Sequence, residues 1–117
     1  MDFINLLFIF DLKLNKYTMA IKKQFLKSKP LCKVTFSISA KEAKEVAVVG
    51  NFNDWNTKAT ALKKQKNGTF KTTVDLPTEN SYEFRYLVDG KSYINDEQAD
   101  SYAWNDFAAA ENGVINL

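Results

Sequence analysis

Alternation of apolar and polar residues is the sequence feature that most limits the folds open to this chain. Large apolar side chains recur at every second position over residues 34–38, 70–76 and 82–88, with Thr72 as the polar member of the set. A period of two places successive side chains on opposite faces of a strand. Each segment is therefore predicted to be a half-buried β-strand.

Turn signals and two further apolar runs extend this pattern. The Asn-Gly pair at 67–68 and the Asp-Gly pair at 89–90 are typical of tight hairpin turns. The β-branched run EVAVVG at 45–50 and the segment GVINL at 113–117 are candidate strands, whereas residues 41–44 have room for one helical turn at most. The sequence thus predicts an all-β fold, an antiparallel sandwich.

The composition excludes several kinds of active site. The chain has no histidine, so it lacks Ser/His/Asp and Cys/His pairs and an imidazole base. Its one cysteine, Cys32, permits neither a disulfide framework nor a thiolate zinc site. Catalytic residues, metal ligands and cofactors are not expected, and the lone cysteine favours the cytoplasm.

The first 31 residues are predicted to form a basic N-terminal arm, disordered or in part a misassigned start, with the sandwich over 32–117. Residues 1–33 hold seven lysines and two acids, whereas the remainder holds nine basic and twelve acidic groups. The apolar run at 3–10 is too short to cross a bilayer and lacks the basic flank of a signal peptide. Two interpretations of this run are open: an interfacial amphipathic segment, or a translation start assigned too early, with Met19 as the first residue.

The most informative segment follows the apolar run that ends at residue 50. Residues 50–56 read GNFNDWN, a glycine followed by a Phe and a Trp three positions apart among Asn and Asp residues. Asn and Asp side chains stabilise turns by bonding nearby backbone groups, so this turn is predicted to hold its two rings in different directions. We expect Phe52 to point into the core and Trp55 to point outward.

This Gly-x-Phe-Asn-x-Trp segment, together with YEFRYLVDG at 82–90, resembles the glycogen- and starch-binding modules of carbohydrate-binding module family 48. That family includes the glycogen-binding domain of the AMP-activated protein kinase β subunit and the early-set domains of isoamylases and branching enzymes. The resemblance covers residues 32–117 and implies an immunoglobulin-like, early-set sandwich. Because the catalytic barrels of those enzymes are absent from the sequence, the chain is predicted not to be an enzyme.

The resemblance also implies which residues contact carbohydrate. Trp55 stands where the family has an outward Trp that stacks on a sugar ring, and Arg85 where it has a basic residue that bonds sugar hydroxyls. Tyr93 falls near the family's second stacking Trp, and Asn112 matches an Asn that contacts hydroxyls. Aromatic platforms with a few planar polar groups suit a glucan chain, which presents C–H faces fringed by hydroxyls.

Each of these residues has a second interpretation that the sequence leaves open. Trp55 could pack in the core, and Arg85 could belong to a solvated face with cross-strand ion pairs. Tyr93 could be a cross-strand packing partner, and Asn112 part of a turn. Trp104 could add a platform or fasten a long loop to the sandwich.

The acidic residues Asp96, Glu97, Asp100 and Asp106 form a second cluster to consider. A pair of carboxylates could serve glycoside hydrolysis, and several oxygens could bind calcium. The sequence offers neither an aromatic cleft nor the EF-hand spacing. A solvated acidic loop is therefore predicted.

Two functions of different classes follow. The first is a non-catalytic, free-standing module that binds an α-glucan polysaccharide or oligosaccharide, with a protein partner in glycogen metabolism as an accompanying expectation. The alternative is a protein-interaction or structural domain that has lost sugar binding and docks through the basic arm at 13–33. Neither nucleic acid nor membrane is the expected partner, because the predicted folded body is mildly acidic.

Overall fold

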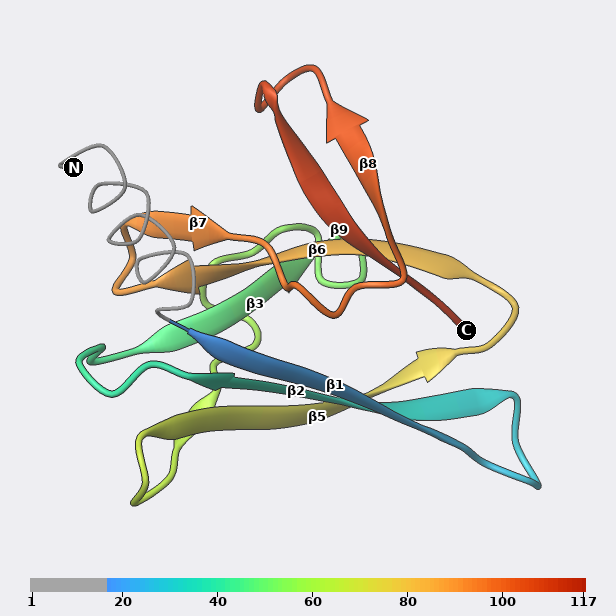
Figure 1. Cartoon of the computed structure of the whole chain (residues 1–117). Coiled ribbons are helices and arrows are strands. Elements are labelled where there is room, and N and C mark those ends of the chain that lie inside the picture. Colours follow the sequence, from blue (N-terminus) through green and yellow to red (C-terminus); the bar gives the residue numbers. More distant parts are fainter. Residues whose placement is uncertain (1–16) are drawn as a thin grey trace, which may run out of the picture.

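The computed structural model describes residues 17–117, which form nine strands and no helix (Figure 1). In chain order the strands are β1 (Thr18–Phe25), β2 (Leu31–Ser39), β3 (Val46–Gly50), β4 (Lys63–Lys64), β5 (Thr69–Pro77), β6 (Ser81–Val88), β7 (Ser92–Ile94), β8 (Ser101–Asn105) and β9 (Ala110–Asn116). They pair antiparallel into two sheets, β1-β2-β5-β4 and β3-β6-β9-β8, with β7 on one edge of β6. The predicted all-β, immunoglobulin-like sandwich is confirmed.

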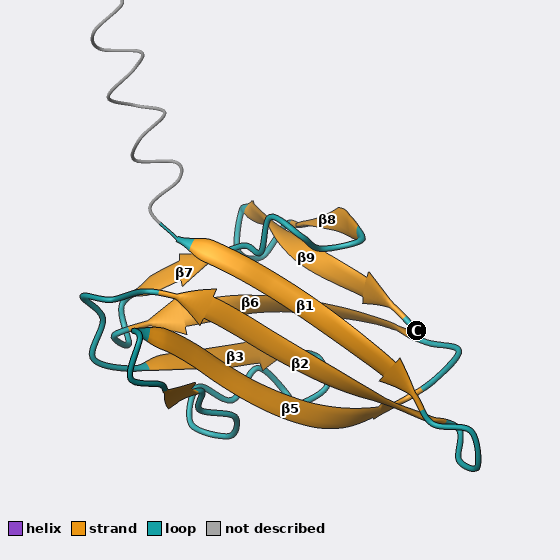
Figure 2. Ribbon diagram, turned by 60° about the horizontal axis from the view of Figure 1, so that its bottom comes forward, coloured by secondary structure: helices purple, strands orange, loops and turns teal. Residues whose placement is uncertain are grey.

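The core lies between the two layers, where the alternating residues of facing strands meet. Figure 2 shows β1, β2 and β5 as one layer over β3, β6 and β9. Phe36 of β2 and Phe84 of β6 are fully buried, with their ring centroids 5.1 Å apart. Burial of each such ring stabilises the fold by roughly 2–3 kcal/mol. The alternation in the sequence thus selects which face of each strand enters the core.

The predicted domain boundary at residue 32 is placed too late. Residues 18–25, which were expected to belong to the arm, form β1 and pair with β2 along its whole length, from Thr18↔Ser39 to Phe25↔Cys32. The sandwich therefore includes Thr18–Phe25, and this part of the basic segment is a strand of the fold rather than part of a separate arm. The apolar run at 3–10 and the question of the first residue lie outside the described residues, although Met19 itself lies within β1.

A lysine on the inward-facing side of β1 explains why this strand is hard to recognise in the sequence. Met19, Ile21 and Lys23 share the half-buried face of β1. The Lys23 ammonium reaches across to the other sheet, where it donates to the Asp100 carboxylate at 2.6 Å and to the Asn116 carbonyl at 3.1 Å. The ammonium group of Lys23 thus closes one side of the sandwich, while the alkyl part of the side chain extends the apolar face formed by Met19 and Ile21.

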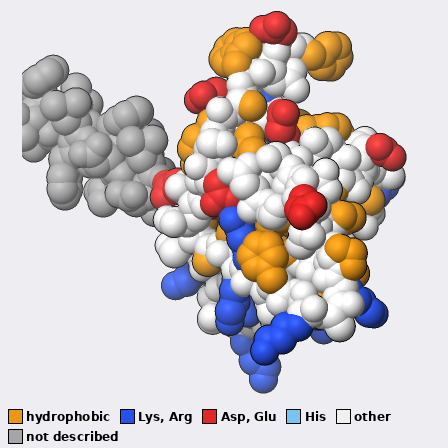
Figure 3. All heavy atoms as spheres, turned by 90° about the vertical axis from the view of Figure 1, so that its right-hand side faces the viewer, with side chains coloured by type: hydrophobic (Ala, Val, Ile, Leu, Met, Phe, Trp, Pro, Cys, Tyr) orange, Lys and Arg blue, Asp and Glu red, His pale blue; other side chains and the backbone are white. Residues whose placement is uncertain are grey.

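The β8–β9 hairpin projects beyond the rest of the sandwich (Figure 1). β9 pairs with β6 only from Gly113 to Asn116, because β7 takes up the same edge of β6 beyond that point. The Asn95 side chain bonds the backbone of Glu111 and of Gly113, where β9 leaves the sheet. Figure 3 shows hydrophobic side chains exposed on this projection and basic ones gathered at the opposite end of the molecule. The strand β8, which contains Trp104, was not predicted.

Candidate functional site

The turn after β3 is built by one asparagine. The Asn53 side chain accepts a hydrogen bond from the Gly50 amide at 3.0 Å and donates to the Val48 carbonyl and the Thr60 hydroxyl, both at 3.0 Å. The Trp55 amide in turn donates to the Gly50 carbonyl at 2.8 Å. These bonds hold Trp55 at a φ of 55°, in the left-handed region that L-residues seldom adopt. The turn therefore places the Trp55 ring at an energetic cost.

The two rings of this turn diverge as the sequence predicted. The Phe52 ring stacks on Phe36 of the core, with centroids 6.0 Å apart and an interplanar angle of 9°. Trp55 keeps 37% of its surface exposed. The prediction of Phe52 inward and Trp55 outward is confirmed, and the interpretation of Trp55 as a core residue is not supported.

All four predicted site residues line one hollow of about 640 Å³ on the outer face of the second sheet. Arg85 lies there because its neighbours in β6, Phe84 and Tyr86, point into the core. The structure thus brings these residues together from four segments, while their contact with carbohydrate stays a prediction. The full lining is Trp55, Arg85, Tyr93, Asn105, Phe107, Ala108 and Asn112.

Arg85 is held by a chain of hydrogen bonds along the floor of the hollow. Its Nε donates to Asn112 Oδ1 at 2.7 Å, and Asn112 Nδ2 donates to Glu83 Oε1 at 2.9 Å. Asn112 is only 1% exposed. Its amide therefore orients the guanidinium from beneath, and the ion pair that the sequence left open for Arg85 is absent from residues 17–117.

Tyr93 forms one wall of the hollow. It is 51% exposed on β7 and lies opposite Leu87 of β6, so it occupies the cross-strand position that the sequence left open. The Arg85 guanidinium lies 5.9 Å from the centre of the Tyr93 ring, within the range of a cation–π contact. The arrangement joins a planar cation to an exposed aromatic ring.

Phe107 is a site residue that sequence reasoning missed. It lies on the turn between β8 and β9, is fully exposed and lines the hollow with Trp55. An exposed aromatic ring within a turn is a signal for binding, but it is visible only once β8 and β9 are recognised as a hairpin. Trp104, by contrast, is 62% exposed, donates its indole N–H to Asp106 and does not line the hollow.

The prediction of a solvated acidic loop is wrong for Asp96, whereas Glu97, Asp100 and Asp106 are exposed. Asp96 is completely buried; it accepts hydrogen bonds from the Tyr86 hydroxyl at 2.7 Å and from the Gln98 amide at 2.7 Å. Burial raises the pKa of the Asp96 carboxyl, although both hydrogen bonds act in the opposite direction. Burial, followed by the charge of Asp96, also raises the pKa of Tyr86. Asp96 thus fastens the segment between β7 and β8 to the core.

We expect Asp96→Asn to change how stability depends on pH. Because the folded-state pKa of Asp96 is raised, the unfolded chain loses the proton first, and stability falls as pH rises from the ordinary value of 3.8 to the folded pKa. The stability of the parent relative to Asp96→Asn should therefore decline across that window. Melting temperatures of both proteins over a pH series measure this, and a difference that does not vary with pH would contradict it.

Two other carboxylates, Asp89 and Asp100, affect the pH dependence of stability in the opposite direction. Their contributions cancel when the parent is compared with Asp96→Asn, because both proteins contain them. Hydrogen bonds from the Glu45 and Lys44 amides lower the pKa of Asp89. Burial raises the pKa of Asp100, but its bonds to Lys23 and the Asn116 amide outweigh burial and lower it. Both contributions are lost as pH falls, in parent and variant alike.

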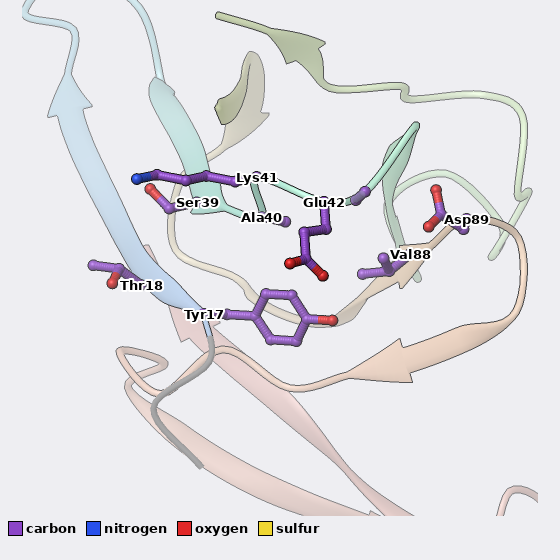
Figure 4. Close-up of a pocket in the computed structure, with 9 residues that line it drawn as sticks. Tyr17, Thr18, Ser39, Ala40, Lys41, Glu42, Val88 and Asp89 are labelled. Carbon is purple, nitrogen blue, oxygen red and sulfur yellow. The ribbon is translucent and has the colours of Figure 1, made fainter. Parts of the chain in front are cut away.

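A separate hollow of about 570 Å³ lies where β1 begins, between Tyr17, Lys41, Glu42 and Asp89 (Figure 4). Tyr17 is its one aromatic side chain, so it lacks the paired rings of the Trp55 hollow. Within residues 17–117 there is no helix long and apolar enough to span a membrane, and no cluster of side chains that could hold a metal ion.

The model of the family described as the glycogen recognition site of AMP-activated protein kinase matches residues 33–115. Comparison with curated proteins gives no match. The matched region contains every residue that lines the Trp55 hollow.

Proposed function

Because the chain belongs to the family of glycogen recognition sites of AMP-activated protein kinase, we propose that it is a non-catalytic module that binds an α-glucan in the Trp55 hollow. The observation that carries this proposal is the convergence of two exposed rings, Trp55 and Tyr93, with the oriented guanidinium of Arg85. A protein partner in glycogen metabolism and a cytoplasmic location are further parts of the proposal, supported by the family and by the lone Cys32.

The chemistry of the hollow suits a sugar chain. Exposed rings offer flat apolar faces for C–H groups, and Arg85 offers planar N–H donors for hydroxyls. On so open a face the binding free energy should be about −4 to −6 kcal/mol, a dissociation constant from about 1 mM to tens of micromolar. Repeated sites on a branched polymer would strengthen retention through avidity.

The absence of a carboxylate from the lining supports a non-catalytic role. Glycoside hydrolysis needs two carboxyl groups beside the scissile bond. The seven described residues that line the hollow include none, and Asp96 is enclosed in the core. Binding without turnover is the function that this set of side chains supports.

Affinity gel electrophoresis tests the proposal. The protein should migrate more slowly through gels that contain glycogen or soluble starch than through plain gels. Hydroxyethyl cellulose, a β-linked glucan, serves as the control polymer and should cause no retardation. Unretarded migration with both α-glucans, or equal retardation by all three polymers, would contradict the proposal.

Asn112 should act mainly by holding Arg85, rather than by the direct hydroxyl contact that the family resemblance implied. We therefore expect Glu83→Ala to weaken maltoheptaose binding about three- to tenfold, although Glu83 does not line the hollow. Glu83→Gln keeps an acceptor for the Asn112 amide and should restore binding. Isothermal titration calorimetry measures both, and equal affinities of parent and Glu83→Ala would refute the positioning role.

A further inference from the structure

Resting on the proposed function, we propose that the bound glucan continues past Tyr93 into a second hollow, so that the ligand is an extended α-glucan chain. This second hollow has a volume of about 480 Å³ and lies beside the Trp55 hollow on the same sheet. Tyr93 lines both. A chain that passes this ring would occupy the two hollows in succession.

Strand geometry makes the two hollows parts of one strip. Arg85 of the first and Leu87 of the second are two residues apart on β6, so their side chains share one face at a spacing of about 7 Å. The opposite wall is also continuous, because one loop supplies Trp55 to the first hollow and Lys58 to the second. The strip therefore runs along β6 between this loop and β7.

The second hollow has the chemistry of a weaker sugar subsite. Leu87 and Ala47 are buried side by side across β3 and β6 and give it an apolar floor. Glu45 and Lys58 line it as exposed side chains. Among residues 17–117, neither the Glu45 carboxylate nor the Lys58 ammonium has a hydrogen-bond or ion-pair partner. Apolar C–H groups fit the floor, while these two side chains can accept from and donate to hydroxyls.

Continuity with the Trp55 hollow favours a glucan chain over an unrelated ligand. The second hollow contains no aromatic residue besides Tyr93, so it has little to hold a separate sugar by stacking. Its two charges are of opposite sign, which does not select an anionic or a cationic partner. It should gain affinity only for a ligand that the first hollow already anchors.

A chain-length series tests the inference. Calorimetric affinities would be measured for maltose, maltotriose, maltopentaose and maltoheptaose, with the parent and the Glu45→Ala/Lys58→Ala double variant. The parent should bind the longer chains more tightly, and the double variant should lose about fivefold on maltoheptaose while binding the shortest bound chain as the parent does. The matched control is Lys41→Ala/Glu42→Ala, which removes the same charges from the separate hollow of Figure 4 and should behave as the parent.

The outcomes separate this inference from the proposed function. Binding of short and long chains with equal affinity, or an equal loss on all chains in the Glu45→Ala/Lys58→Ala variant, would overturn the second subsite while leaving the first intact. No binding of any chain would overturn both. Melting temperatures equal to that of the parent exclude misfolding, which is not expected because both side chains are exposed.

Discussion

Replacing Trp55 by alanine is expected to weaken maltoheptaose binding at least about 30-fold and to abolish retardation in glycogen gels. An aromatic anchor at the centre of a binding surface contributes about 2 kcal/mol or more, which corresponds to that factor. Trp55 is 37% exposed and is not among the side chains that form the core or pack against it, so its removal should leave the core unchanged. Calorimetry measures the affinity, and thermal melting verifies the fold.

Trp104 provides the matched control. It is also an exposed tryptophan, 62% accessible, but it does not line the hollow. Trp104→Ala should therefore bind glucan as the parent does. Equal losses in the two variants would show that exposed aromatic surface in general, rather than the Trp55 hollow, holds the ligand.

Gly50→Ala is expected to cause the largest loss of stability, about 3 kcal/mol. A Cβ at this position would lie 2.4 Å from the Glu83 carbonyl oxygen and 2.8 Å from the Phe52 ring. Both neighbours are constrained, since the Asn51 amide bonds that carbonyl at 3.0 Å and Phe52 packs on the core. Urea unfolding measures the loss.

Gly90→Ala is the control that measures the cost of an unfavourable backbone conformation alone, without the steric clash expected in Gly50→Ala. A Cβ there would meet nothing nearer than 4.0 Å, but the φ of +66° disfavours alanine. The cost should be about 1 kcal/mol. A loss in Gly50→Ala no larger than that in Gly90→Ala would show that the approach of Glu83 to Gly50 is easily relaxed.

The sandwich could be predicted from sequence where local pattern and burial agree. In β2, Val34, Phe36 and Ile38 alternate with polar residues and are all fully buried. β1 and β8 could not be predicted in this way. The inward face of β1 includes Lys23, whose partner Asp100 is distant in sequence, and β8 exposes Trp104 on a projecting hairpin.

Part of the candidate site could likewise be predicted from the sequence, and part could not. Trp55 belongs to a recognisable motif, and Arg85 alternates with apolar residues along a strand. The place of both residues on the outer face could therefore be predicted. The burial of Asp96 could not, because it depends on the hydroxyl of Tyr86, which only the folded core brings to it. The role of Asn112 beneath Arg85 likewise depends on the pairing of β6 with β9.

Amide chemical-shift mapping by two-dimensional NMR during titration with maltoheptaose shows which face of the sandwich binds the glucan. If the glucan binds in the Trp55 hollow, the shifts should concentrate at Trp55, Arg85, Tyr93 and Phe107, with smaller shifts at Lys58 and Leu87. No shifts are expected along β2 and β5, which belong to the other sheet. Shifts confined to that sheet, or no shifts at millimolar oligosaccharide, would contradict the assignment of the Trp55 hollow as a glucan site.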